Sequence, residues 1–213
     1  MSEPDQRDII GYSLKDPQSK QAWIELISKI QDWLRDNDLE EDILFHGTSL
    51  SRAEDILKYG FNPTDITLSV TQEMGYDAGS FWGNVLTASA YADDTCENRN
   101  PDSRPVLLAV SAEALEEECL LYPDLATLDM PLKGLTKLDD PEISELWLST
   151  FSVDYDSPED ILTWEDGLRD LGAIVAVHDV ILPQEMFHKV DSFETFLDFA
   201  EPLKARTTKA MTA

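Results

Sequence analysis

The sequence predicts a mixed α+β domain rather than a doubly wound parallel sheet. Apolar residues recur at helical spacing between Pro17 and Asp36, which predicts one amphipathic helix before any strand. Short apolar runs at 43–45, 105–110 and 173–177 predict buried strands. Few of these strands are separated by a simple crossover helix, and such an order is typical of α+β folds.

The first strand, over 43–45, leads directly into a His-Gly pair. We expect this strand to end at His46, and we expect Gly47, which has no side chain, to let the backbone turn and a ligand approach. A His between a strand and a helix is well placed to contact a ligand. A helix is expected to follow, with either Ser49 or Ser51 as its N-cap. We expect Gly60 to end this helix as a left-handed C-cap residue.

The rest of the chain alternates short elements with irregular connections. Further strands are expected at 81–82, 105–110, 146–153 and 173–177, with 180–182 as a continuation of the last one. Helices are expected at 85–95, 112–118, 157–171 and 192–199, the third beginning with Ser157 as N-cap and Pro158 as its first residue. The predicted organisation is a helical extension over 1–42, a main domain over 43–200 and a flexible tail over 201–213.

The chain is strongly acidic. It carries 43 Asp and Glu against 16 Lys and Arg, a net charge of −27. Such a field repels nucleic acid, and no basic stripe with interleaved aromatic residues offsets it, so we expect no direct nucleic-acid binding. Three explanations of the acidity stay open: solubility, adaptation to a salty cytoplasm, or mimicry of a polyanion that engages a basic protein partner.

Composition also bears on location and metal content. No apolar run approaches the roughly 18 residues that a membrane span needs, and the N-terminus lacks a signal-peptide core, so we expect a cytoplasmic protein without membrane contact. Cys96 and Cys119 are expected to be reduced thiols. His178 and His188 have no partner at metal-ligand spacing, so no metal site is expected.

Three short segments carry a resemblance to a known fold. His46-Gly47-Thr48 comes first, Phe81-Trp82-Gly83 second, and Ala88-Ser89-Ala90-Tyr91-Ala92 follows. In this order they resemble the ADP-ribosyltransferase fold of poly-ADP-ribose polymerases, diphtheria-type toxins and RNA 2′-phosphotransferases. The resemblance implies a mainly antiparallel split sheet with flanking helices, preceded by the N-terminal helix. It also implies NAD as substrate and transfer of ADP-ribose to a macromolecular acceptor.

The resemblance assigns roles to particular residues. His46, Gly47 and Thr48 would hold the amide and ribose of the nicotinamide half of NAD. Trp82 and Tyr91 would stack on the pyridinium ring, which aromatic faces hold well. We therefore expect His46, Trp82 and Tyr91 to line one pocket. Arg52 lies one helical turn after the first motif. It is either an anion contact or a surface residue paired with a neighbouring acid.

The catalytic acid is expected in the segment 157–165. This segment resembles the catalytic-Glu region of diphtheria-type toxins, in which a Glu precedes a Trp by five residues, as Glu159 precedes Trp164. Glu159 would stabilise the positive charge that develops on the ribose as nicotinamide leaves. The alternative is an ordinary helix start, where Glu159 complements the helix dipole. The competing acids are Glu145, Asp160 and Glu165.

The second motif departs from the polymerase pattern. Polymerase-type members have Gly-x-Ile-Tyr where this chain has Gly83-Asn84-Val85-Leu86, so Leu86 takes the place of a stacking Tyr. Two hypotheses follow. One is an active NAD-dependent transferase whose catalytic residues are His46, Tyr91 and Glu159. The other is a catalytically inactive acidic protein that binds or inhibits a basic partner.

Overall fold

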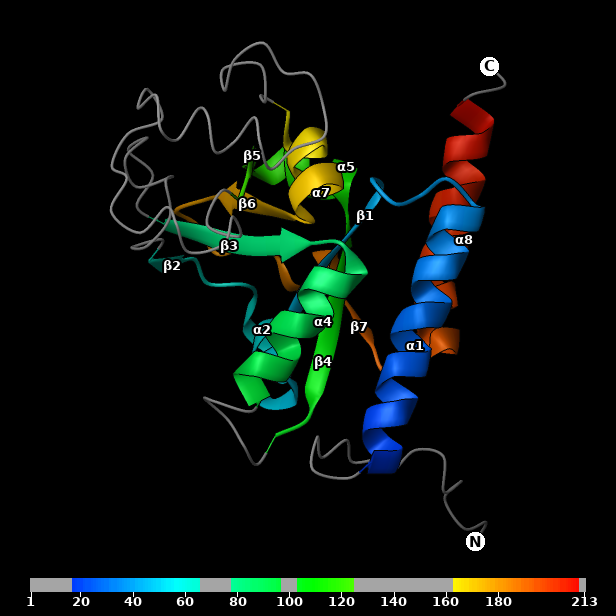
Figure 1. The fold of residues 1–213 in the computed structure, drawn as a ribbon. Coiled ribbons are helices and arrows are strands. Elements are labelled where there is room, and N and C mark those ends of the chain that lie inside the picture. The colour runs from blue at the N-terminus through cyan, green and yellow to red at the C-terminus, as the bar shows by residue number, and fades with distance from the viewer. Residues whose placement is uncertain (1–16, 66–77, 97–102, 125–162, 211–213) are drawn as a thin grey trace, which may run out of the picture.

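A computed structural model describes residues 17–65, 78–96, 103–124 and 163–210. They form one sheet with helices packed against it (Figure 1). The helices are α1 (Pro17–Asp36), α2 (Leu50–Tyr59), α4 (Val85–Asp94), α5 (Ala112–Glu118), α7 (Trp164–Leu171) and α8 (Phe193–Ala210). The strands are β1 (Ile43–Ser49), β2 (Thr64–Asp65), β3 (Ala78–Gly83), β4 (Pro105–Ser111), β5 (Leu120–Pro123), β6 (Ala173–Val177) and β7 (His188–Val190), with a 3-10 turn, η6, at Gln184–Met186.

All strand pairs in this sheet are antiparallel, in the order β5-β6-β3-β1-β4-β7, and β2 pairs with β3. The sheet has two halves, because within the described residues β1 and β3 are joined by the single pair Phe45↔Gly83. In Figure 1, β3 and β4 accordingly run in clearly different directions. The predicted α+β class, with an antiparallel split sheet, flanking helices and an N-terminal helix, is confirmed.

The two faces of the sheet bury separate hydrophobic cores, because successive residues of a strand point to opposite faces. Ile43 and Phe45 point into the core covered by α1, α4 and α8. Leu44, between them, points into the core covered by α2, α5 and α7. Five buried residues of α1 belong to the first core, so this helix packs against the same face of the sheet as α4 and α8.

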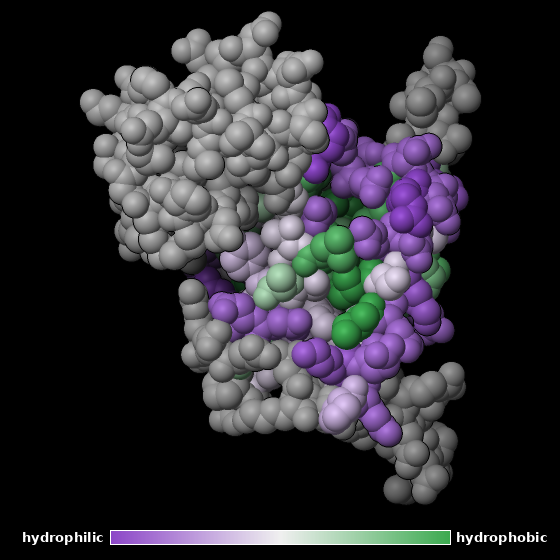
Figure 2. Space-filling view, in the orientation of Figure 1, coloured by the Kyte–Doolittle hydropathy of each residue, from purple (hydrophilic) through white to green (hydrophobic). Residues whose placement is uncertain are grey.

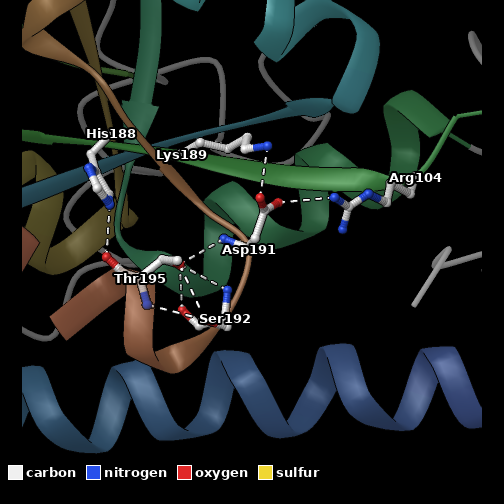
Figure 3. A network of polar contacts seen from close by, with 6 residues as sticks. All are labelled: Arg104, His188, Lys189, Asp191, Ser192 and Thr195. Atoms are coloured by element: carbon white, nitrogen blue, oxygen red, sulfur yellow. Dashed lines mark hydrogen bonds and ion pairs between the residues drawn. The ribbon is translucent and has the colours of Figure 1, made fainter. Parts of the chain in front are cut away.

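A polar network fixes the start of α8 (Figure 3). Ser192 Oγ accepts from Thr195 N–H at 3.1 Å, and Thr195 Oγ1 accepts from the N–H groups of Asp191 and Ser192 at 3.1 and 3.0 Å. The Asp191 carboxylate pairs with Arg104 at 3.1 Å and with Lys189 at 2.8 Å. The N–H of Thr195 in the first turn of the helix and those of the two residues before the helix are thus satisfied, and the start of α8 is tied to β7 and to the residue before β4.

Several predicted boundaries are wrong. β1 does not end at His46 but continues to Ser49, because β4 pairs with it along its whole length. The helix expected over 157–171 begins at Trp164, where Thr163 Oγ1 caps the N–H of Asp166 at 3.2 Å. The proposed N-cap Ser157 and the strand expected at 146–153 lie outside the described residues.

The C-terminal part of the chain also differs from expectation. The stretch 180–182 is not a strand, and only Leu182 forms an isolated bridge, with Phe61. β5 and β7, which the sequence does not predict, form the two edges of the sheet. α8 continues through Pro202 to Ala210, beyond the expected start of the tail at 201.

Candidate functional site

The most distinctive feature of the sheet is the place where β1 and β3 separate after the pair Phe45↔Gly83. We call the facing edges of these two strands beyond that pair the split. The direction of the β1 backbone groups follows from hydrogen bonds at its two ends. The Asp42 carbonyl accepts from Ala112 at 2.9 Å, and Leu50 N–H donates to the Arg104 carbonyl at 2.8 Å. The backbone groups of even-numbered residues in β1 therefore point toward β4.

Since backbone groups alternate in direction along a strand, those of odd-numbered residues point toward β3. At Phe45 they meet Gly83. At Gly47, the next odd position, both the N–H and the C=O point into the split. A neighbouring donor and acceptor of this kind match a primary amide, which carries one of each.

At Gly47 the backbone of α4 also lies very close to the sheet. A Cβ added there would collide with the carbonyl group of Ala88 and approach the nitrogen of Ala92 to 2.9 Å. The sequence-based prediction that Gly47 lets the backbone turn is therefore wrong. Its missing side chain instead allows α4 to lie directly on the strand, close to the split.

His46 closes part of the split with its side chain. Its Nδ1 lies 2.8 Å from the Phe81 carbonyl oxygen, and a carbonyl only accepts, so Nδ1 carries the proton. Burial lowers the pKa of His46 to about 4, an effect opposed by this hydrogen bond and increased by the charge of Arg52. The imidazole is therefore neutral at physiological pH, and its Nε2 is an acceptor.

An aromatic cluster supports the His46 ring. The ring contacts Phe61 edge-on at 4.8 Å between centroids and lies 5.5 Å from Trp82. Phe187 stacks on Trp82 at 5.6 Å and contacts Phe61 at 5.8 Å. Phe61, Trp82 and Phe187 are buried, so this cluster is a wall behind His46 rather than an exposed stacking surface.

The expected pocket of three residues is met only in part. The structure brings His46 and Trp82 together, but Tyr91 lies on α4, which covers the opposite face of β1. Tyr91 is 44% exposed, and its pKa is raised by burial and by the charges of Asp124 and Asp94. This placement counts against the second motif of the resemblance. Tyr91 and His46 therefore lie on opposite faces of the sheet.

The face of α1 and α4 beside Tyr91 carries exposed apolar side chains. In Figure 2 apolar atoms gather where these two helices adjoin, surrounded by hydrophilic residues. The large apolar side chains exposed on the two helices, besides Tyr91, are Ile24 at 51% and Leu86 at 46%. Leu86, which stands where the polymerase pattern has Tyr, therefore points to solvent.

The other expected site residues lie in different parts of the chain. Thr48 is buried in β1, and Arg52 is exposed on α2. Glu159, Glu145 and Asp160 lie outside the described residues, so the predicted catalytic acid stays a prediction. Glu165 lies in the first turn of α7, which covers the same face of the sheet as Trp82.

Sequence reasoning missed a second polar group near His46. Trp82 Nε1 donates to Ser80 Oγ at 2.8 Å, and Ser80 Oγ lies 2.9 Å from His178 Nε2. Phe61, which contacts His46, and Phe187, which contacts Phe61 and Trp82, were also missed. The Gly60-Phe61 pair at the end of α2 was the one local signal available for this cluster.

No family model, curated protein or solved structure was found to match this chain. Among the described residues, no group of three or more His, Cys, Asp and Glu is arranged to hold a metal ion. In the same part of the chain, none of the helices has the length and apolarity needed to cross a membrane.

Proposed function

We propose that this protein binds NAD at the split between β1 and β3 and transfers ADP-ribose to a macromolecular acceptor. One observation carries the proposal: the N–H and C=O of Gly47 point together into the split, beyond the last β1–β3 pair. The carboxamide of nicotinamide presents the complementary acceptor and donor. Two such hydrogen bonds fix the plane of the ring relative to β1.

Three further residues suit the rest of the ligand. Neutral His46 offers Nε2 as an acceptor for a ribose hydroxyl. Arg52, whose charge acts on His46, supplies the positive charge that a pyrophosphate needs in an acidic protein. Tyr91, on the other face, is exposed enough to cover the nicotinamide ring.

In the proposed reaction the bond between the ribose C1′ and the nicotinamide nitrogen breaks, and nicotinamide leaves as a neutral molecule. Positive charge develops on the ribose, and a carboxylate stabilises it, for which Glu159 is the proposed residue. A nucleophilic group of the acceptor then bonds to C1′ and loses its proton. His46 and Gly47 would hold the ribose and the amide while this occurs.

The test is a thermal-shift and calorimetric titration of the full chain with NAD, nicotinamide and ADP-ribose. At one hundred times its Kd, a ligand that binds only the folded state stabilises it by about 2.7 kcal/mol, which is a rise in Tm of several degrees. His46→Ala should weaken NAD binding. His188→Ala is the matched control, because His188 lies on β7 and donates to the Thr195 carbonyl at 2.8 Å. An unchanged Tm at millimolar NAD would contradict the proposal.

A second candidate function rests on the net charge of −27. In this alternative the fold is an inactive scaffold, and the acidic surface binds a basic protein. The two candidates give different results in the same assays. The alternative predicts no response to NAD, and a complex with a basic protein whose affinity falls steeply as salt is raised.

A further inference from the structure

Ser80, Trp82 and His178 form a chain of hydrogen bonds behind His46. The Val180 carbonyl lies 2.8 Å from His178 Nδ1 and only accepts, so Nδ1 carries the proton and Nε2 of the neutral ring accepts. Ser80 Oγ–H must then donate to Nε2, and Ser80 Oγ accepts from the Trp82 indole N–H. Every bond thus has one possible direction, from Trp82 through Ser80 and His178 to the Val180 carbonyl.

This chain is buried, with Ser80 1%, Trp82 2% and His178 5% exposed. Because the site is buried, an indole N–H without its acceptor would lower the stability of the fold by the full free energy of desolvation of that group. Ser80 and Trp82 come from β3, whereas His178 follows β6, so the chain also joins two neighbouring strands. Its effect is to fix the orientation of the Trp82 indole.

The indole in turn touches His46, at 5.5 Å between ring centroids. His46 keeps its Nδ1 proton on the Phe81 carbonyl only while its ring stays in the present plane. We propose that Ser80 and His178 are positioning residues, which hold Trp82 so that His46 presents Nε2 as an acceptor beside the split. This inference rests on the proposed function for its ligand, but its geometric part is independent of NAD.

The experiment measures the NMR signals of Trp82 and His46 and, separately, the affinity for NAD. The protein has five Trp, so the indole N–H of Trp82 gives one of five indole signals in a ¹H–¹⁵N spectrum. The signal is assigned by its loss in Trp82→Phe. Imidazole ¹⁵N shifts report which nitrogen of His46 is protonated. In Ser80→Ala we expect the Trp82 indole signal to move upfield and the single Nδ1–H form of His46 to become a mixture. NAD affinity should fall by about tenfold, the order of one lost hydrogen bond.

Further variants serve as controls. Ser80→Cys keeps the size of the side chain but offers a weaker acceptor, so it should give the same changes if Ser80→Ala does not fold. His178→Gln places an amide oxygen near the former Nε2 and should restore most of the native signals, whereas His178→Leu should not. His188→Leu, which removes a His whose ring stacks on Phe199 in the other core, should leave the Trp82 and His46 signals unchanged.

The outcomes separate the two claims. If the wild type does not bind NAD but Ser80→Ala changes the His46 protonation form, the proposed function fails and the positioning role stands. If the Trp82 and His46 signals are unchanged in both Ser80 variants, the positioning role is overturned, whether or not NAD binds. Weaker NAD binding with unchanged signals would also overturn it, because the loss would then come from another cause.

Discussion

Acidification tests the electrostatic description of His46 directly. In the unfolded chain His46 takes up a proton near the ordinary histidine pKa of 6.5, whereas the folded protein resists protonation until about pH 4. Unfolding below pH 6.5 therefore takes up a proton, and the free energy of unfolding falls as the pH falls from 6.5 toward 4. At pH 5 this single group should cost about 2 kcal/mol relative to pH 7.5.

The assay is urea unfolding of the wild type and of His46→Asn at pH 7.5, 6.5 and 5. Measurements stop at pH 5 because the sequence pI is near 4.1, where the protein loses its net charge. Asn can still donate to the Phe81 carbonyl but does not titrate. The lowered pKa of His178 and the raised pKa of Asp42 affect both proteins alike and cancel in the difference.

We expect the wild type to lose about 2 kcal/mol more than His46→Asn between pH 7.5 and pH 5. Whatever stability the substitution removes at neutral pH does not enter this comparison. Parallel pH profiles for the two proteins would refute the description of His46 as a buried neutral imidazole. The assignment of His46 Nε2 as an acceptor would then be wrong as well.

The remaining predictions concern other parts of the molecule. Gly47→Ala should lower the free energy of unfolding by about 1–3 kcal/mol, because a Cβ collides with α4, and urea unfolding will measure it. Thr163→Ala should cost about 1 kcal/mol through the lost cap of α7 and leave NAD binding unchanged. Glu159→Gln should leave NAD binding nearly intact but reduce turnover in an NAD glycohydrolysis assay, whereas full activity would remove Glu159 as the catalytic acid. The thiols of Cys96 and Cys119, whose pKa values burial raises to about 11, should resist a thiol reagent at pH 8 until the protein unfolds.

Local patterns in the sequence predicted the elements with strong periodicity. The spacing of apolar residues gave α1 its observed bounds, Pro17–Asp36, and the branched run gave β6 at Ala173–Val177. β7 and β5 were missed because they are three and four residues long and are strands only through their partners. Thr163 was missed as an N-cap because Ser157-Pro158 offers an equally good local signal.

The sequence identified some residues near the candidate site but not how they are arranged in space. His46 and Trp82 were placed together on motif order alone, and their rings do lie together. The direction of the Gly47 backbone groups depends on how β1 pairs with β4, and their place in the split depends on where β1 stops pairing with β3. Both are long-range properties that no local pattern encodes. Tyr91 was misplaced for the same reason, since the face that α4 covers is set by packing against α1 and Phe45.

The measurement that tests the central claim most directly compares the affinities of NAD and nicotinic acid adenine dinucleotide. The two differ only in the group proposed to meet Gly47, a carboxamide in the first and a carboxylate in the second. A carboxylate has no hydrogen to donate to the Gly47 carbonyl and brings its own negative charge against that oxygen. We predict that the acid analogue binds at least about tenfold more weakly than NAD. Equal affinities, or no binding of either dinucleotide, would contradict the claim that the split between β1 and β3 holds a carboxamide.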